Sequence, residues 1–297
     1  MKTSKSSNRY GKLFTVPVII SLIVLLVIIF AVVAAPLLAP CDPNHLDLAH
    51  MLEGPTKDHI LGTDKTGRDV FSRLLYGGRT SLLSALAVVG LSVIIGIPIG
   101  LISGYYGGRI DAILMRICDV VVAFPALLLA FIFVAAFGRG LANSILALGI
   151  VYVPMLAKLT RSLMLVEKNK TYVEADHSIG YSNARIIFLE ILPNCLSTIF
   201  VELSLDIGYA ILDMASMSFL GLGVQPPTSD WGYMLEENRA FLTTHPLTAI
   251  SPGIAIILFV VALNVFMDGV QDYLDPSRRR MPKMATFKRK LGIRDGV

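Results

Sequence analysis

The sequence predicts an all-α membrane protein with six membrane-spanning helices. Of its 297 residues, 54% are hydrophobic and only 16% are charged, whereas soluble domains carry roughly a quarter charged residues. Uncharged apolar runs long enough to cross a hydrocarbon layer of about 30 Å recur along the chain. Lys and Arg gather at the ends of these runs and in the C-terminal tail, which is typical of a polytopic topology.

The first apolar run, residues 14–38, follows a basic arm at residues 1–13. No charged residue stands between Lys12 and Asp42. A cleaved secretory signal also has a basic start, but its apolar region is usually about 7–15 residues long. We therefore expect a retained first membrane helix, with a cleaved signal as the alternative.

Five further apolar runs lie in a core at residues 80–272. They cover residues 80–108, 120–138, 141–157, 195–222 and 247–267. Six spans place both chain ends on one side of the membrane. That side then carries 19 of the 26 Lys and Arg residues, which predicts cytoplasmic termini, including the basic tail at 273–297, by the positive-inside rule.

The loop at residues 39–79 is expected outside the cytoplasm. Val70, Phe71 and Leu74 fall on one face of a helix, which predicts a short interfacial helix here. Thr63 or Asp64 would cap it, and the pair at residues 77–78, both glycine, would end it before the second span. An ordinary surface helix is the alternative.

The second span carries small residues at four-residue intervals, namely Ser92, Gly96, Gly100 and Gly104. Residues four apart lie on the same face of a helix. In lipid, such small side chains allow helices to approach closely enough for van der Waals contact to hold them together. The spacing predicts that the three glycines pack against another helix.

The fifth span contains three acidic residues, Glu202, Asp206 and Asp213. On a helix they fall within roughly 40° of one another. Carboxylates inside a membrane are costly and face cavities or basic partners, so they either line a pathway for a solute or clamp helices together. Lys158 and Arg161, near the end of the fourth span, are the expected basic partners.

Neither a catalytic nor a metal site is predicted. The three cysteines are widely spaced, and the sequence has no HExxH or GxSxG motif. A formal charge of +4 is too small to indicate nucleic acid as a partner.

A basic loop at about residues 167–193 follows the fourth span. Its pattern predicts two short helices that are broken at Gly180, meet at a corner and are stopped by Pro193. Such a projecting element is suited to docking in the groove of a partner protein.

This loop resembles the EAA loop of ABC-importer permeases. The matching residues are Glu174-Ala175, Gly180 and Leu192-Pro193, whereas Asp176 stands where the family usually has a second alanine. Residues 61–77 and 210–235 resemble two further signatures of the dipeptide, oligopeptide and nickel subfamily. The chain is most similar to the C-type subunit, which implies the type I ABC-importer permease fold.

The resemblance implies half of a translocation pathway for di- or oligopeptides, with nickel or a metal chelate as the alternative substrate. It implies a bacterial cytoplasmic (inner) membrane, a second homologous permease, one or two ABC ATPase subunits and an extracytoplasmic solute-binding protein, which the loop around Trp231 would meet. The partner ATPase would use ATP and Mg²⁺. This chain has no GxxxxGK[ST] phosphate loop, so we expect no bound cofactor and no enzymatic activity.

Two other classes of protein compete with this interpretation. An ion-coupled secondary transporter would have inverted repeats and its own coupling-ion site. An intramembrane enzyme would need catalytic groups that converge from different helices, whereas Asp206 and Asp213 lie on one helix.

Overall fold

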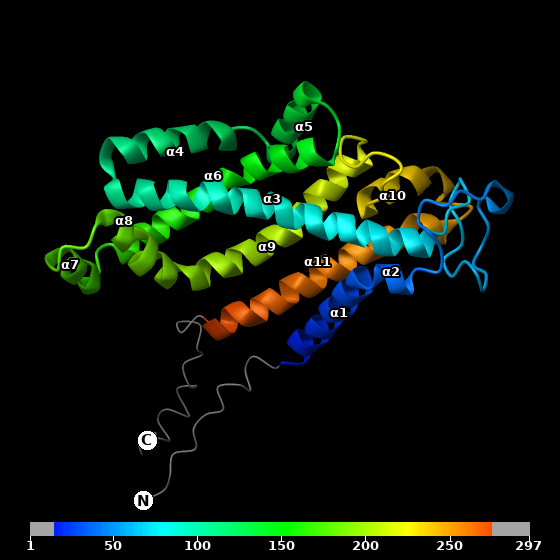
Figure 1. The fold of residues 1–297 in the computed structure, drawn as a ribbon, viewed down its shortest axis with the longest axis horizontal. Helices are drawn as coiled ribbons and strands as arrows, with labels where there is room; N and C mark the ends of the chain where they lie inside the picture. Colours follow the sequence, from blue (N-terminus) through cyan, green and yellow to red (C-terminus); the bar gives the residue numbers. More distant parts are fainter. Residues whose placement is uncertain (1–14, 275–297) are drawn as a thin grey trace, which may run out of the picture.

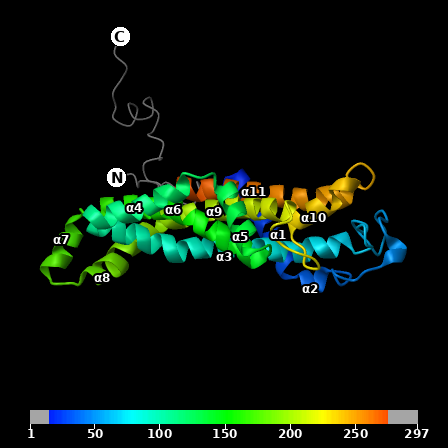
Figure 2. The ribbon, with the colours of Figure 1, turned by 90° about the horizontal axis from the view of Figure 1, so that it is seen from above.

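The computed structural model describes residues 15–274, and this part of the chain is helical without a β-strand. The predicted basic arm and nearly all of the basic tail lie outside the described residues. The helices run in one elongated bundle (Figures 1 and 2). They are α1 (Val16–Val33), α2 (Ala35–Leu38), α3 (Val70–Tyr106), α4 (Gly108–Val122), α5 (Ala126–Phe137), α6 (Leu141–Glu167), α7 (Thr171–Ser178), α8 (Asn183–Arg185), α9 (Leu192–Phe219), α10 (Trp231–Asn238) and α11 (Pro246–Leu274).

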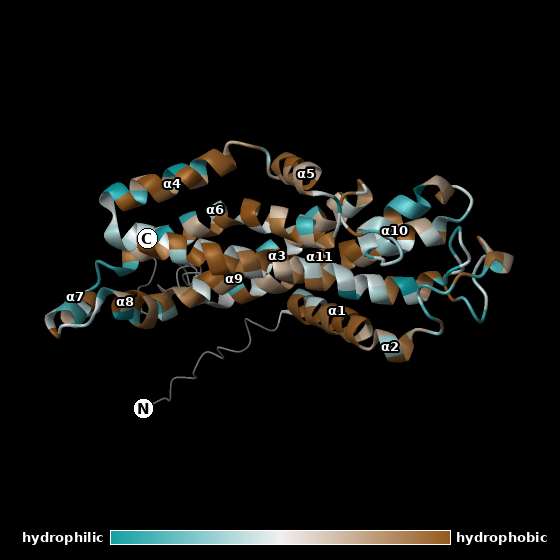
Figure 3. Cartoon of the chain, turned by 45° about the horizontal axis from the view of Figure 1, so that its top comes forward, coloured by the Kyte–Doolittle hydropathy of each residue, from teal (hydrophilic) through white to brown (hydrophobic). Residues whose placement is uncertain are grey.

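Five helices are long and apolar enough to cross a membrane: α1, α3, α6, α11 and the continuous helix Asn183–Phe219, which joins α8 to α9. Counted together as one broken span, α4 and α5 bring the number in the described chain to six. The predicted all-α, six-span class is therefore confirmed. Figure 3 shows hydrophobic residues along α1 and α5, and hydrophilic residues around α7 and in the loop before α3.

The third span is bent at Pro125, the proline at which a kink is expected in this apolar run. The helices α4 and α5 meet at an angle of 87°, and Pro125 caps α5 at the break. A proline has no backbone N–H to donate and disfavours helical geometry in the residue before it. One continuous helix through residues 120–138 is therefore excluded.

The prediction of a separate interfacial helix before the second span is wrong. Helix α3 continues through the pair Gly77-Gly78 for 37 residues, a length of about 55 Å. Its cap is Asp69, whose carboxylate accepts from the Ser72 N–H at 2.7 Å, and not Thr63 or Asp64. The two glycines serve packing instead of ending the helix, because a Cβ on Gly78 would lie 2.8 Å from the indole of Trp231.

The predicted glycine stripe of α3 faces α6. A Cβ on Gly96 would lie 3.0 Å from the Val153 carbonyl oxygen, and one on Gly100 only 2.4 Å from that of Ala157. At Gly104, a Cβ would approach the Met164 side chain to 2.8 Å. At Gly100 and Gly104 these distances leave no room for a methyl group, whereas at Gly96 the neighbouring backbone would have to give by a few tenths of an ångström, so the close contact between α3 and α6 depends on glycine.

We expect Gly100→Ala to destabilise the protein by about 1–3 kcal/mol, because the added methyl forces α3 away from α6. Gly90 is a matched control on the same helix, since a Cβ there meets nothing within 4 Å. Gly90→Ala should be neutral or stabilise by up to about 1 kcal/mol. Unfolding of both variants in detergent, followed by circular dichroism, measures the difference, and equal stability would contradict the packing argument.

Candidate functional site

The predicted corner loop projects from one end of the bundle as α7 and α8 (Figure 1). Between these helices the chain turns at Gly180, whose φ is +86° and whose missing Cβ would meet nothing within 4 Å. This φ is in the left-handed region, which strongly favours glycine. The turn therefore requires Gly180, although no neighbouring group crowds it.

One face of the corner loop is exposed and the other packs on the bundle. Glu174, Ala175 and Gly180 are exposed, while Asp176 is half-buried. On the inner face, Val173 is buried in an apolar cluster with Ile186, Ile187 and Ile191. The loop is thus fixed by its own core while the residues that resemble the family motif remain accessible.

The expectation that Pro193 stops the second corner helix is wrong. From Asn183 the helix continues through a π-helical turn, Ile186–Ile191, into α9, and Pro193 lies in the first turn of α9. A π turn is wider than an α turn, which gives the proline ring room where regular α geometry would clash. Leu192 packs partly against the inner cluster. The corner loop is therefore joined to the fifth span without a break.

The inner end of α3 holds both arms of the corner. The Tyr105 hydroxyl donates to Asn183 Oδ1 at 3.0 Å and lies 3.2 Å from His177 Nε2. The Lys168 ammonium, at the end of α6, donates to the Gly104 carbonyl at 2.7 Å. Sequence reasoning missed Tyr105, because no local pattern distinguishes it from its neighbour Tyr106.

The predicted acidic stripe of α9 has different partners from those expected. The Tyr152 hydroxyl of α6 donates to Asp213 Oδ2 at 2.7 Å. Asp206 is 9% exposed and makes no hydrogen bond or ion pair with any residue that the structure describes. Glu202 is half-exposed.

The prediction that this stripe pairs with Lys158 and Arg161 is wrong. Lys158 pairs with Asp119 at 2.7 Å and Arg161 with Asp111 at 2.5 Å, both on α4. The sequence pattern could not show this, because it does not reveal which helix packs against the end of α6.

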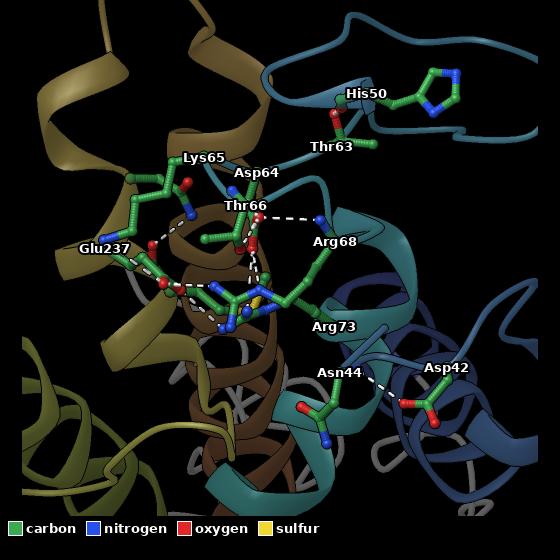
Figure 4. A network of polar contacts seen from close by, with 12 residues as sticks. Asp42, Asn44, His50, Thr63, Asp64, Lys65, Thr66, Arg68, Arg73 and Glu237 are labelled. Atoms are coloured by element: carbon green, nitrogen blue, oxygen red, sulfur yellow. Dashed lines mark hydrogen bonds and ion pairs between the residues drawn. The ribbon is translucent and has the colours of Figure 1, made fainter. Parts of the chain in front are cut away.

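A network of ion pairs closes the opposite end of the bundle (Figure 4). Arg73 donates to Asp64 Oδ2 at 3.0 Å and to Glu237 Oε2 at 2.9 Å. Arg68 donates to the same two carboxylates, at 2.8 Å and 2.5 Å. All four residues are buried, and the exposed Lys65 approaches Glu237 from outside at 3.7 Å. We call these four buried residues the outer clamp; it joins the loop before α3 to α10.

The two positive charges of the outer clamp are balanced by its two carboxylates. Burial opposes ionisation of Asp64, but Arg73, the Thr66 hydroxyl and Arg68 outweigh it and lower the pKa of this carboxyl. Removal of one partner from a buried ion pair leaves an uncompensated charge without water. The outer clamp is therefore stable only when it is complete.

Trp231 is not on the surface, so its own side chain does not form the contact expected between its loop and a binding protein. The side chain is 1% exposed, its indole N–H donates to the Leu74 carbonyl at 2.9 Å, and its backbone N–H donates to Ser81 Oγ at 3.1 Å. An aromatic ring with a satisfied N–H is a stable core residue. Trp231 fixes α10 onto α3.

Asp230 caps α10 from a buried position. Its Oδ1 accepts from the Tyr233 N–H and its Oδ2 accepts from the Ser218 hydroxyl, both at 2.7 Å. Burial raises the pKa of Asp230 to about 6, against the hydrogen bonds that lower it. The loop between α9 and α11 is thus attached through a carboxyl that ionises near neutral pH.

Comparison with known proteins assigns the chain to a family. Residues 96–280 match the family described as "Binding-protein-dependent transport system inner membrane component". The chain is 46% identical over 233 residues to the glutathione transport system permease protein GsiD of Pectobacterium atrosepticum, covering 78% of this chain and 77% of that protein. It is 41% identical over 261 residues to the dipeptide transport system permease protein DppC of Alkalihalophilus pseudofirmus, covering 88% and 86%.

The fold is also found in a solved transporter. An inward-facing structure of the MetNI methionine ABC transporter aligns with a TM-score of 0.56 and 15% identity, covering 68% of this chain and 97% of that one. This likeness shows the fold, while the family match and the named relatives show a transport subunit with several membrane helices. The chain belongs to the family of binding-protein-dependent inner membrane components, the permeases of ABC importers, which confirms the resemblance seen in the sequence.

For the outer clamp, we expect Glu237→Gln to destabilise the protein by about 3–5 kcal/mol, because two buried arginines would then share one carboxylate. Glu236→Gln is the matched control, because Glu236 is partly exposed and its ion pair with the exposed Arg239 is long, at 3.9 Å. Exposed ion pairs of this kind contribute little, so we expect a change in stability of at most about 1 kcal/mol. Thermal unfolding in detergent compares them, and an equal effect of both changes would refute the role of the clamp.

The raised pKa of Asp230 predicts that the stability of the protein depends on pH. Because the folded-state pKa of about 6 lies above the ordinary value of 3.8, the folded protein binds the extra proton, and this contribution to stability is lost as pH rises from about 4 to about 6. As pH rises across this range, the free energy of unfolding of the wild type should fall by about 1–3 kcal/mol relative to that of Asp230→Asn. Above pH 6 the difference between the two proteins should stay constant. Parallel pH profiles would exclude this assignment.

Proposed function

We propose that this chain is one of two permease subunits of an ATP-driven importer of di- or oligopeptides. Its partners would be a second homologous permease, one or two ABC ATPase subunits and an extracytoplasmic solute-binding protein. Relatives of this chain are named as permeases for dipeptides, for di- and tripeptides and for glutathione. Glutathione is itself a tripeptide, so these names share one substrate class.

The observation that carries the proposal is the corner loop. Glu174 and Ala175 on α7, and Gly180 in the turn that follows it, are exposed on the projecting loop. The exposed Ile179 adds an apolar contact beside Gly180. A rigid, projecting pair of short helices is suited to a groove on a partner. In this proposal the partner ATPase binds the loop and uses ATP and Mg²⁺, while this chain binds no cofactor and catalyses no reaction.

Movement of the docked ATPase would reach the membrane through two connections. The first is the continuous helix from Asn183 to Phe219. The second is Tyr105, which links both arms of the corner to α3. Domain motions of this kind move packed helices as rigid bodies, so the corner loop and the spans would respond together.

The orientation proposed is that of a bacterial inner membrane protein with its corner loop and both termini in the cytoplasm. The distribution of Lys and Arg supports this orientation. The outer clamp then lies on the extracytoplasmic side, where it holds α10 and the loop before α3 in place for the binding protein.

The acids of α9 are proposed to line part of the pathway. Asp206 is the strongest candidate, because an acid in a spanning helix without a partner in the described chain is costly unless it meets water or solute. Asp213 already accepts a hydrogen bond from Tyr152, so its main role would be to hold α9 against α6. Glu202, half-exposed near the corner-loop end, would meet solvent.

Two alternatives use the same chain differently. A nickel or metal-chelate importer would need the same permease architecture, but the names of the relatives favour peptides. An ion-coupled secondary transporter would work without an ATPase. Reconstitution of the purified complex in liposomes separates these classes: dipeptide uptake should require ATP and the binding protein, whereas uptake driven by a proton gradient alone would overturn the proposal.

The role of the corner loop is tested by Gly180→Trp in the same liposomes. We expect normal membrane insertion but loss of substrate-stimulated ATP hydrolysis, because the indole blocks close docking of the ATPase. Gly221→Trp is the matched control, since Gly221 also has a positive φ of +74° and open space around it but lies at the other end of α9. Normal stimulation in Gly180→Trp would remove the corner loop from the mechanism.

A further inference from the structure

A charged hollow lies between α4 and α6. Figure 1 shows these helices running side by side toward the end of the bundle that carries the corner loop. Its volume is about 680 Å³, within the range of about 300–1,000 Å³ that is usual for small-molecule sites. Five charged residues line it: Asp111, Arg116, Asp119, Lys158 and Arg161. None of them belongs to the acidic stripe of α9 or to the corner loop.

One ion pair in the hollow is fixed. Arg161 donates through Nε and Nη2 to the two oxygens of Asp111, each at 2.5 Å. The Ser103 hydroxyl of α3 also donates to Asp111. A carboxylate held by three donors is already satisfied, so this pair fastens α4 to α6 and forms one wall of the hollow.

The other charges are open. Lys158 and Asp119 are 2.7 Å apart, but their side chains are 42% and 53% exposed. Exposed ion pairs contribute little to stability and separate easily. Arg116 is exposed and has no ion pair with any residue in the described part of the chain. The hollow therefore offers one accessible carboxylate and two accessible cations on facing helices.

These charges lie on the corner-loop side of the uncharged runs at residues 120–138 and 141–157, where Lys and Arg gather at the ends of the spans. A peptide with free termini carries one ammonium and one carboxylate, so its charges complement those of the hollow. When it enters, the ammonium can replace Lys158 beside Asp119, and the carboxylate can engage Lys158 and Arg116. Arginine is well suited to that contact, because its guanidinium matches the geometry of a carboxylate.

We propose that the hollow between α4 and α6 is a binding station for zwitterionic peptides on the translocation pathway. Asp119 takes the peptide ammonium, and Lys158 with Arg116 takes the peptide carboxylate. This inference rests on the proposed function and adds to it the groups that recognise the substrate at the corner-loop end of the spans. Recognition uses only the termini, so side chains of different kinds are accepted.

The test compares Arg116→Met with Arg109→Met in liposomes that contain the complete importer and its binding protein. Both arginines are exposed on α4 without a described partner, but only Arg116 lines the hollow. With labelled dialanine below saturation, we expect Arg116→Met to lower uptake roughly tenfold, the effect of losing one hydrogen bond to a charged group. Arg109→Met should match the unaltered complex.

ATP hydrolysis stimulated by the loaded binding protein should persist in both variants, so the number of ATP molecules used per peptide rises only in Arg116→Met. Arg116→Lys should recover most of the uptake, and Asp119→Asn should lower it. Equal uptake by Arg116→Met and Arg109→Met would overturn the binding station while leaving the proposed function intact. Failure of the unaltered complex to take up dialanine with ATP would instead overturn the proposed function.

Discussion

The contact between α3 and α6 is the constraint on which the other features depend. In lipid, the hydrophobic effect does not drive helices together, so association requires close van der Waals contact. Gly96, Gly100 and Gly104 provide it, because a methyl group would collide with α6 at Gly100 and Gly104 and would be crowded by it at Gly96. The outer clamp is attached to the start of α3, and Tyr105 and Lys168 attach the corner loop to its end. The two ends of the molecule are thus connected by one glycine-packed pair of helices.

Charged residues divide into two groups according to their access to water. In the outer clamp, Arg68 and Arg73 share Asp64 and Glu237 in a fully buried arrangement, which makes that end rigid. Around the hollow between α4 and α6, only Asp111 and Arg161 are fixed, and the remaining charges are exposed. The proposed import function would use both kinds of site, because a rigid end suits a stable contact with a binding protein and open charges can exchange partners with a solute.

Most of the fold could be predicted because its signals are local. Hydrophobic runs without charge gave the spans, and the four-residue spacing of glycines gave the face of α3 that packs. The errors occurred where a distant contact overrides a local signal. The pair Gly77-Gly78 is a good stop signal, yet it lies within α3 because Trp231 and Asp230 pack against it. Likewise, the π turn before Pro193 allows a helix to continue where proline would otherwise end it.

The sequence by itself determined the family, the class of fold, the corner loop with its obligatory turn at Gly180, and the presence of acids in the fifth span. These follow from residue order and from helical periodicity, which need no knowledge of neighbours. Only the tertiary structure decided which charges meet: Lys158 and Arg161 pair with α4 instead of α9, Tyr152 reaches Asp213, and Glu237 joins arginines more than 160 residues away in the sequence. The reason is that a side chain pairs with whatever the packing brings within about 3 Å, and residue spacing along the chain does not reveal which helices pack together.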